Sequence, residues 1–177
     1  MIKIMLFLQG TLLMHRSGVG KTRQQIVKQS QDRGESLRDF ASYVPIGHAV
    51  EKLQRWANQG VKILYLSALT ENKNARGDEI VGKEGLMIDQ KVLNRYGFPK
   101  GEIYHRQTGE RYAQIAERLG PDVLIEDDCE SIGGASEMTI TAVRPEIKSR
   151  IKSIVVKEFG GIDHLPDDLD ELLRNQK

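Results

Sequence analysis

Cysteine, net charge and long apolar runs are all scarce in this sequence of 177 residues. With one cysteine, Cys129, the chain forms no internal disulfide, which favours a reducing compartment, so we expect a cytoplasmic protein. A formal net charge of +1 gives no electrostatic footprint for nucleic acid or an anionic membrane. The longest apolar runs have the length of a strand, so neither a signal peptide nor a membrane span is expected.

Hydrophobic residues make up 39% of the chain, which is enough for one compact core. We expect a single domain over residues 1–177. Its chemistry-bearing motifs lie within residues 1–134, and residues 135–177 form a C-terminal extension with a strand and a helix.

Short apolar runs alternate with helical patterns along the chain. The runs predict strands at 2–8, 61–66 and 123–125, and the patterns predict helices at 21–31, 48–59, 84–96 and 110–119. An edge strand is expected at 154–156, a short helix at 166–174, and a surface loop at 72–85. This order predicts an α/β fold: a doubly wound, mostly parallel sheet with helices on both faces.

In such sheets ligands bind at the carboxyl ends of the strands. We therefore expect residues 9–11, Ser67 and residues 126–128 to converge.

The stretch HRSGVGKT, residues 15–22, is an alternative phosphate site. A P-loop would use Gly20, Lys21 and Thr22 in a nucleotide hydrolase, with an acidic strand end at VLIEDD holding magnesium. However, His15 stands where the first glycine of that loop belongs, and QGTLLM separates it from the strand. The other interpretation is a loop before a helix, with Lys21 on a solvated face.

The order of the other motifs resembles the haloacid dehalogenase-like (HAD) superfamily over residues 1–134. The matching segments are IMLFLQGTLL, ILYLSALT and HRQTGERYAQIAERLGPDVLIEDD. The family pattern is matched at Gly10, Thr11 and Leu12, at Ser67, at Arg106, and at the acids Glu126, Asp127 and Asp128. LIEDDCESIGG followed by EFGGIDHLP is also similar to proteins of this superfamily. The resemblance implies a HAD-like Rossmannoid fold without a large cap domain, and hence an open site.

The first motif departs from that pattern. Phe7 and Gln9 stand where the resemblance implies the aspartate nucleophile and the aspartate acid/base. A phenyl ring cannot attack phosphorus and a carboxamide cannot shuttle a proton, so the covalent mechanism loses both groups. A typical metal set would also lose one carboxylate, leaving the Gln9 carbonyl with Asp127, Asp128 and Glu126, so we expect weak Mg²⁺ binding at most.

Groups that would hold an anion remain. They are the backbone N–H groups of residues 9–11, including Gly10 and Thr11, the Ser67 hydroxyl and the Arg106 guanidinium. The alternative is structural: Thr11 and Ser67 cap turns, Arg106 pairs with the acids, and the acids cap a helix.

Two classes of function therefore stay open. One is a degenerate or non-classical phosphohydrolase that binds a phosphorylated small molecule or macromolecule. An open site of this kind predicts either a bulky partner or a homo-oligomer in which another subunit closes the site. The other is an active magnesium-dependent phosphatase that uses water activated by a metal on Asp127.

Overall fold

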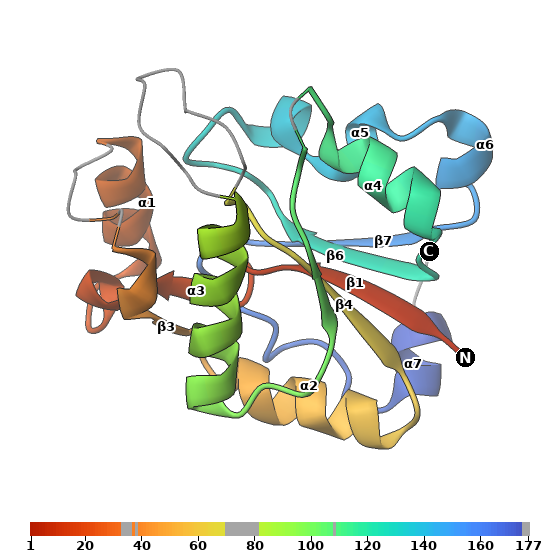
Figure 1. The fold of residues 1–177 in the computed structure, drawn as a ribbon, viewed down its shortest axis with the longest axis horizontal. Coiled ribbons are helices and arrows are strands. Elements are labelled where there is room, and N and C mark those ends of the chain that lie inside the picture. The colour runs from red at the N-terminus through yellow and green to blue at the C-terminus, as the bar shows by residue number, and fades with distance from the viewer. Residues whose placement is uncertain (33–36, 38, 70–81, 108, 175–177) are drawn as a thin grey trace.

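A computed structural model describes residues 1–177 except 33–36, 38, 70–81, 108 and 175–177. Its centre is a five-stranded sheet in the order β5-β4-β1-β6-β7, with every neighbouring pair parallel (Figure 1). The strands are β1 (Lys3–Phe7), β4 (Lys62–Leu66), β5 (Glu102–Tyr104), β6 (Val123–Asp127) and β7 (Lys152–Val156). The predicted α/β fold with a parallel sheet is confirmed.

Helices cover both faces of the sheet. The buried core on one face includes residues of α2 (Ala49–Asn58), α3 (Gly82–Tyr96) and α7 (Leu169–Arg174). The core on the other face includes residues of α4 (Tyr112–Leu119) and α5 (Thr139–Ala142), with α6 (Pro145–Lys148) packed beside it. Figure 1 shows the two helical layers above and below the strands.

Strand β1 shows why the strands read as continuous apolar runs. Ile4 and Leu6 belong to the core under α2 and α3, whereas Met5 between them belongs to the core under α4. All three are fully buried, because successive side chains of a strand point to opposite faces and both faces are covered.

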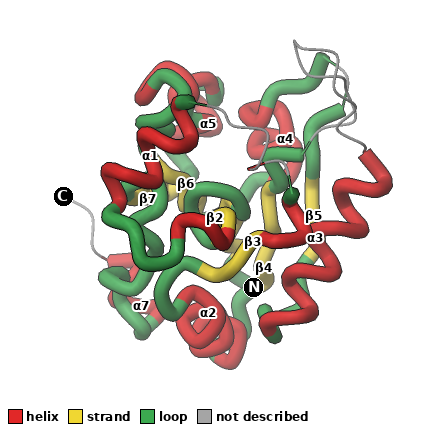
Figure 2. The backbone as a smooth tube through the Cα atoms, turned by 90° about the vertical axis from the view of Figure 1, so that its left-hand side faces the viewer, coloured by secondary structure: helices red, strands yellow, loops and turns green. Residues whose placement is uncertain are grey.

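A small insertion follows β1. It consists of β2 (Leu13–His15), the 3₁₀ turn η1 (Arg16–Gly18), α1 (Arg23–Gln31), the 3₁₀ turn η3 (Phe40–Ser42) and β3 (Tyr43–Pro45). Strands β2 and β3 pair in antiparallel fashion, with Leu13 opposite Pro45. We call residues 13–45 the flap. β1 runs toward the flap, which Figure 2 shows in front of the sheet.

Several element boundaries differ from the sequence-based ones. Helix α1 begins at Arg23, because the Thr22 hydroxyl accepts from Gln25 N–H and Gln25 bonds back to Thr22 N–H, a capping box. Helices α4 and α7 begin at Tyr112 and Leu169, later than expected. Strands β2, β3 and β5 have three residues each, too short for a recognisable periodicity. A surface loop was expected at 72–85. Its residues 72–81 are not among those that the structure describes, and residues 82–85 belong to α3, which begins at Gly82.

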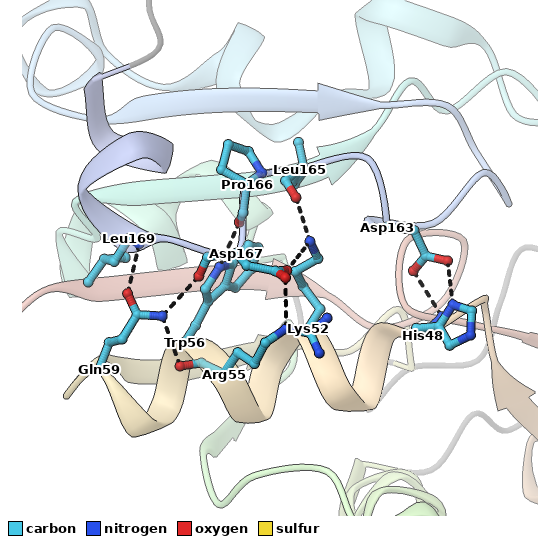
Figure 3. A network of polar contacts seen from close by, with 10 residues as sticks. All are labelled: His48, Lys52, Arg55, Trp56, Gln59, Asp163, Leu165, Pro166, Asp167 and Leu169. Atoms are coloured by element: carbon cyan, nitrogen blue, oxygen red, sulfur yellow. Dashed lines mark hydrogen bonds and ion pairs between the residues drawn. The ribbon is translucent and has the colours of Figure 1, made fainter.

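The expected C-terminal extension, residues 135–177, is part of the core. Strand β7 pairs with β6, and Ile162, Leu169 and Leu172 are buried in the main cluster. Polar contacts join the segment after β7 to α2 (Figure 3): Lys52 Nζ donates to Leu165 O and Asp167 Oδ1, both at 2.5 Å, and Trp56 Nε1 donates to Pro166 O at 3.0 Å. Among the described residues, no helix is long and apolar enough to cross a membrane.

Candidate functional site

The candidate site lies where the order of the strands reverses. From β1 the chain adds β4 and β5 on one side and then β6 and β7 on the other. At such a switch point the connections leave in opposite directions and open a crevice at the carboxyl ends of β1 and β6. A cavity of about 330 Å³ occupies this position, and Phe7, Gln9, Gly10 and Asp127 all line it.

Gly10 makes the tight turn after β1. Its φ of +88° is left-handed, and a Cβ there would lie 2.7 Å from Asp127 Oδ2, so no other residue fits without displacing that carboxylate. The Gly10 N–H donates to Leu13 O at 2.9 Å, and the Phe159 N–H donates to Gly10 O at 2.7 Å. The turn is therefore fixed on both sides, and the Gly10 N–H already has an acceptor.

Asp127 ends β6 and faces that turn. Thr11 Oγ1 donates to Asp127 Oδ2 at 2.8 Å, and the Cys129 N–H donates to Oδ1 at 3.0 Å. Burial raises the pKa of Asp127, although the bonds from Thr11 and Cys129 oppose that shift. Thr11 is fully buried and does not line the cavity, because its hydroxyl is committed to this carboxylate.

The other two acids of the motif have different partners. Glu126 accepts the N–H groups of Thr139 at 2.6 Å and Ile140 at 2.9 Å, at the start of α5. Asp128 accepts from Lys157 Nζ at 2.9 Å and from the Glu158 N–H at 3.0 Å. The three acids predicted as metal ligands therefore do not present their oxygens to one point.

A magnesium ion is a poor fit to this donor set. Among the described residues no group of three His, Cys, Asp or Glu side chains is arranged to hold a metal ion. Both oxygens of Asp127 accept protein hydrogen bonds, and Phe7 supplies no oxygen where β1 ends. Mg²⁺ requires several oxygen ligands in near-octahedral geometry, and the described residues of the cavity do not supply such a set.

Ser67 and Gln9 meet at a buried carboxylate that the sequence interpretation missed. Ser67 Oγ donates to Asp89 Oδ2, and Gln9 Nε2 donates to Asp89 Oδ1 at 2.9 Å. The Ala68 N–H in turn donates to Gln9 Oε1 at 2.8 Å, which fixes the amide. Ser67 is fully buried outside the cavity, whereas Gln9 lines it.

Asp89 lies on the inner face of α3 and is 1% exposed. Burial raises its pKa to about 6, and the hydrogen bonds from Ser67 and Gln9 oppose the shift. The sequence signal that was available is the spacing of Asp89 three residues before the buried Val92. That spacing places both residues on one side of the helix. That pattern alone does not distinguish a buried acid from one at the edge of a solvated face.

Arg106 lines the cavity and stacks on Tyr112. Its guanidinium carbon lies 4.4 Å from the centroid of the Tyr112 ring, a cation–π contact. Arg106 Nε is buried and has no hydrogen-bond partner among the described residues. The Tyr112 ring also meets Phe7 edge to face at 4.8 Å, and its hydroxyl donates to Ser67 O at 2.9 Å. Tyr112 thereby holds Arg106 beside the end of β1.

Of the four predicted phosphate-binding residues, Gly10 and Arg106 line the cavity, whereas Thr11 and Ser67 do not. Thr11 and Ser67 instead donate to Asp127 and Asp89. Ser67 Oγ also accepts from the Leu69 N–H at 3.0 Å, a turn cap of the kind that the structural alternative describes, whereas the bond of Thr11 is to a carboxylate distant in sequence.

Aromatic rings and strained backbone concentrate at this cavity. Four of the ten aromatic residues line it, namely Phe7, Tyr43, Tyr112 and Phe159. Cys129 and Phe159 have φ values of 52° and 59°, and they are the only non-glycine residues with positive φ in the described part of the chain. Both line the cavity. Strained backbone of this kind clusters at functional sites.

The flap forms one side of the cavity. His15, Ser17, Ile26, Gln29 and Tyr43 line the cavity from its side. The sequence showed one helix here, but it did not reveal the β2–β3 pairing that holds that helix over the strand ends.

The P-loop alternative lacks its structural setting. Residues 15–22 begin at the last residue of β2, a short strand that pairs in antiparallel fashion with β3 outside the five-stranded sheet, so no strand of the central sheet leads directly into them. Lys21 Nζ donates to Gln29 Oε1 at 2.8 Å, and Thr22 caps α1. Gly20 has a φ of +80° with open space around it.

Fold and site together define a parallel α/β protein with a ligand-sized cavity at its switch point. No model of a known protein family matches the sequence, and no curated protein matches it. Among solved structures, D,D-heptose 1.7-bisphosphate phosphatase from B. bronchiseptica, complexed with magnesium and phosphate, is similar at 13% sequence identity. The match covers 90% of this chain and 94% of that one, with a TM-score of 0.45. Similarity of this extent establishes no family for the chain.

Proposed function

We propose that this protein binds a phosphorylated small molecule in the switch-point cavity and does not transfer its phosphoryl group to the protein. Arg106 carries the proposal: its guanidinium belongs to a residue that lines the cavity, and stacking on Tyr112 holds it in place. Guanidinium groups pair with phosphate through two parallel hydrogen bonds.

The aromatic lining suits the organic part of such a ligand. Phe7, Tyr112 and Phe159 surround the core side of the cavity, and Tyr43 lines it from the flap. Ligand sites are typically apolar cavities of this size with a few fixed polar groups. We therefore expect a flat, largely apolar group attached to the phosphate.

Covalent transfer lacks its groups in this geometry. Phe7 packs on Tyr112 and carries no nucleophile, and the Gln9 amide is held between Asp89 and Ala68. Burial and nearby carboxylates raise the pKa of the Cys129 thiol, with burial the larger cause, so Cys129 is not an activated nucleophile.

The buried carboxylates near the cavity do not exclude an anion. Glu158 accepts from the N–H and the hydroxyl of Ser131, each at 2.6 Å. Like Asp127 and Glu126, it is thus engaged by donors of its own neighbourhood. Burial raises the pKa of each of these three acids, which favours their neutral forms.

Binding of three small probes tests the proposal. Phenyl phosphate, phenol and benzylamine are titrated into the protein without metal and followed by ¹H–¹⁵N NMR. We expect phenyl phosphate to shift signals of the cavity residues more strongly than phenol, and Arg106→Gln to weaken its binding at least 10-fold, the loss of a charged hydrogen bond. Arg118→Gln, an exposed arginine on α4, is the matched control. Binding of benzylamine with none of phenyl phosphate would refute the proposal.

The alternative of a magnesium-dependent phosphatase is tested on the same protein. Turnover of 4-nitrophenyl phosphate is measured with magnesium, in the unchanged protein and in Asp127→Asn. We expect no turnover in either. Turnover that disappears in Asp127→Asn would favour metal-activated water and overturn the binding function.

A further inference from the structure

Four polar residues of the flap form a chain of hydrogen bonds in which each residue donates to the next, from Lys21 to His15. Lys21 Nζ donates to Gln29 Oε1 at 2.8 Å, Gln29 Nε2 donates to Ser17 Oγ at 2.7 Å, and Ser17 Oγ lies 2.8 Å from His15 Nδ1. An ammonium group only donates, so Gln29 must turn its oxygen to Lys21 and its NH₂ group to Ser17. The hydroxyl hydrogen of Ser17 is then directed to His15 Nδ1.

The backbone leads to the same assignment. The Ser17 N–H donates to His15 Nδ1 at 3.2 Å, so this nitrogen is an acceptor. A neutral imidazole with an acceptor at Nδ1 carries its hydrogen on Nε2. Burial lowers the pKa of His15, and Arg16 and Lys21 act in the same direction against Asp39, which favours the neutral ring.

The His15 ring is held in place at the flap side of the cavity. It meets the Tyr43 ring edge to face at a centroid distance of 5.7 Å, and both residues line the cavity. Its Nε2–H lies on the ring edge away from Ser17 and has no acceptor among the described residues. The cavity thus has a cation at its core side, Arg106, and an oriented neutral donor at its flap side.

We infer that the flap side of the cavity is a second subsite, in which His15 donates its Nε2–H to a neutral hydrogen-bond acceptor at the far end of the ligand. The inference rests on the proposed function, because it assumes that the phosphate of the same ligand lies at Arg106. It narrows the ligand class to phosphate esters whose organic part ends in a carbonyl or hydroxyl oxygen.

A second anionic group is disfavoured at the flap side. Among the described residues that line the cavity Arg106 is the only arginine or lysine, so a second anionic group would have no cation to pair with there. Lys21 does not line the cavity and its ammonium group is bonded to Gln29. A neutral acceptor satisfies His15 without the cost of burying an unpaired charge.

Paired probes test the subsite. 4-Acetylphenyl phosphate is compared with 4-ethylphenyl phosphate, and 4′-acetylbiphenyl-4-yl phosphate is compared with its ethyl analogue. The two members of each pair differ only in a carbonyl oxygen, and the distance from that oxygen to the phosphate is longer in the biphenyl pair. In the pair whose length fits the cavity, we expect the ketone to bind about 3- to 10-fold more tightly than its ethyl partner, because it gains one hydrogen bond. His15→Phe, which keeps a ring against Tyr43, should abolish this ratio. His48→Phe, an exposed histidine outside the cavity, should not.

Equal affinities within both pairs, while binding still depends on Arg106, would overturn the subsite and leave the proposed function standing. No binding of any of the four phosphates would overturn both. Binding of all four without dependence on Arg106 would overturn the assumed position of the phosphate and the subsite with it.

The tautomer of His15 is tested without any ligand. Long-range ¹H–¹⁵N NMR of the histidine rings should show His15 with its hydrogen on Nε2 and a bare Nδ1. Lys21→Met removes the group that sets the direction of the chain, so the two tautomers should mix in that variant. A hydrogen on Nδ1 in the unchanged protein would contradict the inference.

Discussion

At the scale of single residues, Asp89 orients two side chains at the strand ends. No carboxylate is present at position 9, but the Gln9 amide is oriented by a carboxylate from α3. The same carboxylate accepts the hydroxyl of Ser67, so one buried acid determines how two residues at the strand ends are turned.

Asp89 should make the stability of the protein depend on pH. Its pKa is raised from 3.8 to about 6, so the native state holds the proton more tightly than the unfolded chain does. Stability contributed by the neutral acid is therefore present below pH 4 and is lost as pH rises toward 6. The loss is on the order of 3 kcal/mol, and it is complete about one pH unit above the native pKa.

Urea unfolding between pH 4 and pH 7 measures this loss. Asp89→Asn should reduce the decline by about that amount, because an amide does not ionise. A remainder is expected from Glu126, Asp127 and Glu158, whose pKa values burial also raises. Asp128→Asn is the control: burial alone would raise the pKa of Asp128, but bonds from the Glu158 N–H and Lys157 lower it, so its contribution changes only below pH 4. A decline that persists unchanged in Asp89→Asn would contradict the assignment.

The sequence indicated some of these residues and missed others for physical reasons. Gly10, Arg106 and Asp127 follow or precede regular elements at predictable positions, so their place at the strand ends could be expected. The direction in which Thr11 and Ser67 turn depends on carboxylates distant in sequence, which no local pattern encodes. The contributions of His15, Tyr43 and Phe159 depend on the position of the flap and on the loop after β7.

At the scale of elements, the flap is held to the body of the protein by few polar contacts. Arg23 Nη1, at the start of α1, lies 2.7 Å from Glu130 Oε2 and donates to Glu158 O at 3.3 Å. The two side chains are 30% and 43% exposed, so the pair contributes little to global stability. Its role is local, because it joins α1 to the loops after β6 and β7.

Removing this contact should loosen α1 alone. We expect Arg23→Gln to lower the free energy of unfolding by less than about 1 kcal/mol. The rate of amide hydrogen exchange in residues 24–31 should rise about 2- to 5-fold, because a loss of this size makes local opening of α1 more frequent by that factor. Hydrogen exchange with mass spectrometry measures both α1 and the sheet in one experiment.

Lys28→Gln, an exposed position on the same helix, is the matched control and should leave exchange unchanged. Equal increases in α1 and in the strands would mean that Arg23 supports the whole fold rather than the flap.

Elements with strong periodicity were predictable, and short ones were not. The amphipathic pattern of α2 and the apolar runs of β1, β4 and β6 are local signals. Strand β5 and the β2–β3 pair have three residues each, and they form because a partner strand is in place. Such pairing is a property of the tertiary structure.

At the scale of the whole molecule, hydrogen bonds and an ion pair connect the C-terminal segment after β7 to α2, in the first half of the chain. Lys52 is 4% exposed, and its ammonium group is paired with Asp167 and Leu165 O. Trp56, the only tryptophan, donates to Pro166 O in the same interface. Its fluorescence therefore reports on the docking of this segment.

Lys52→Met should weaken the whole protein and not the C-terminal segment alone. It leaves Leu165 O without its donor, so we expect a loss of about 1–3 kcal/mol. In urea, Trp56 fluorescence and far-ultraviolet circular dichroism should still change together, as expected of one domain. His48→Ala, which removes the exposed pair with Asp163, is the control and should cost less than about 1 kcal/mol. A fluorescence change at lower urea than the dichroism change would show that the segment unfolds separately.

The pairing of Leu13 with Pro45 has a consequence for how such a protein can diversify. The two ends of the flap leave the body side by side, so a segment of different length or sequence can replace it without moving any strand of the central sheet. The core and the covering segment can accordingly accumulate changes independently. Grafting the segment between Leu13 and Pro45 from one such scaffold onto another would exchange what is recognised while the scaffold stays the same.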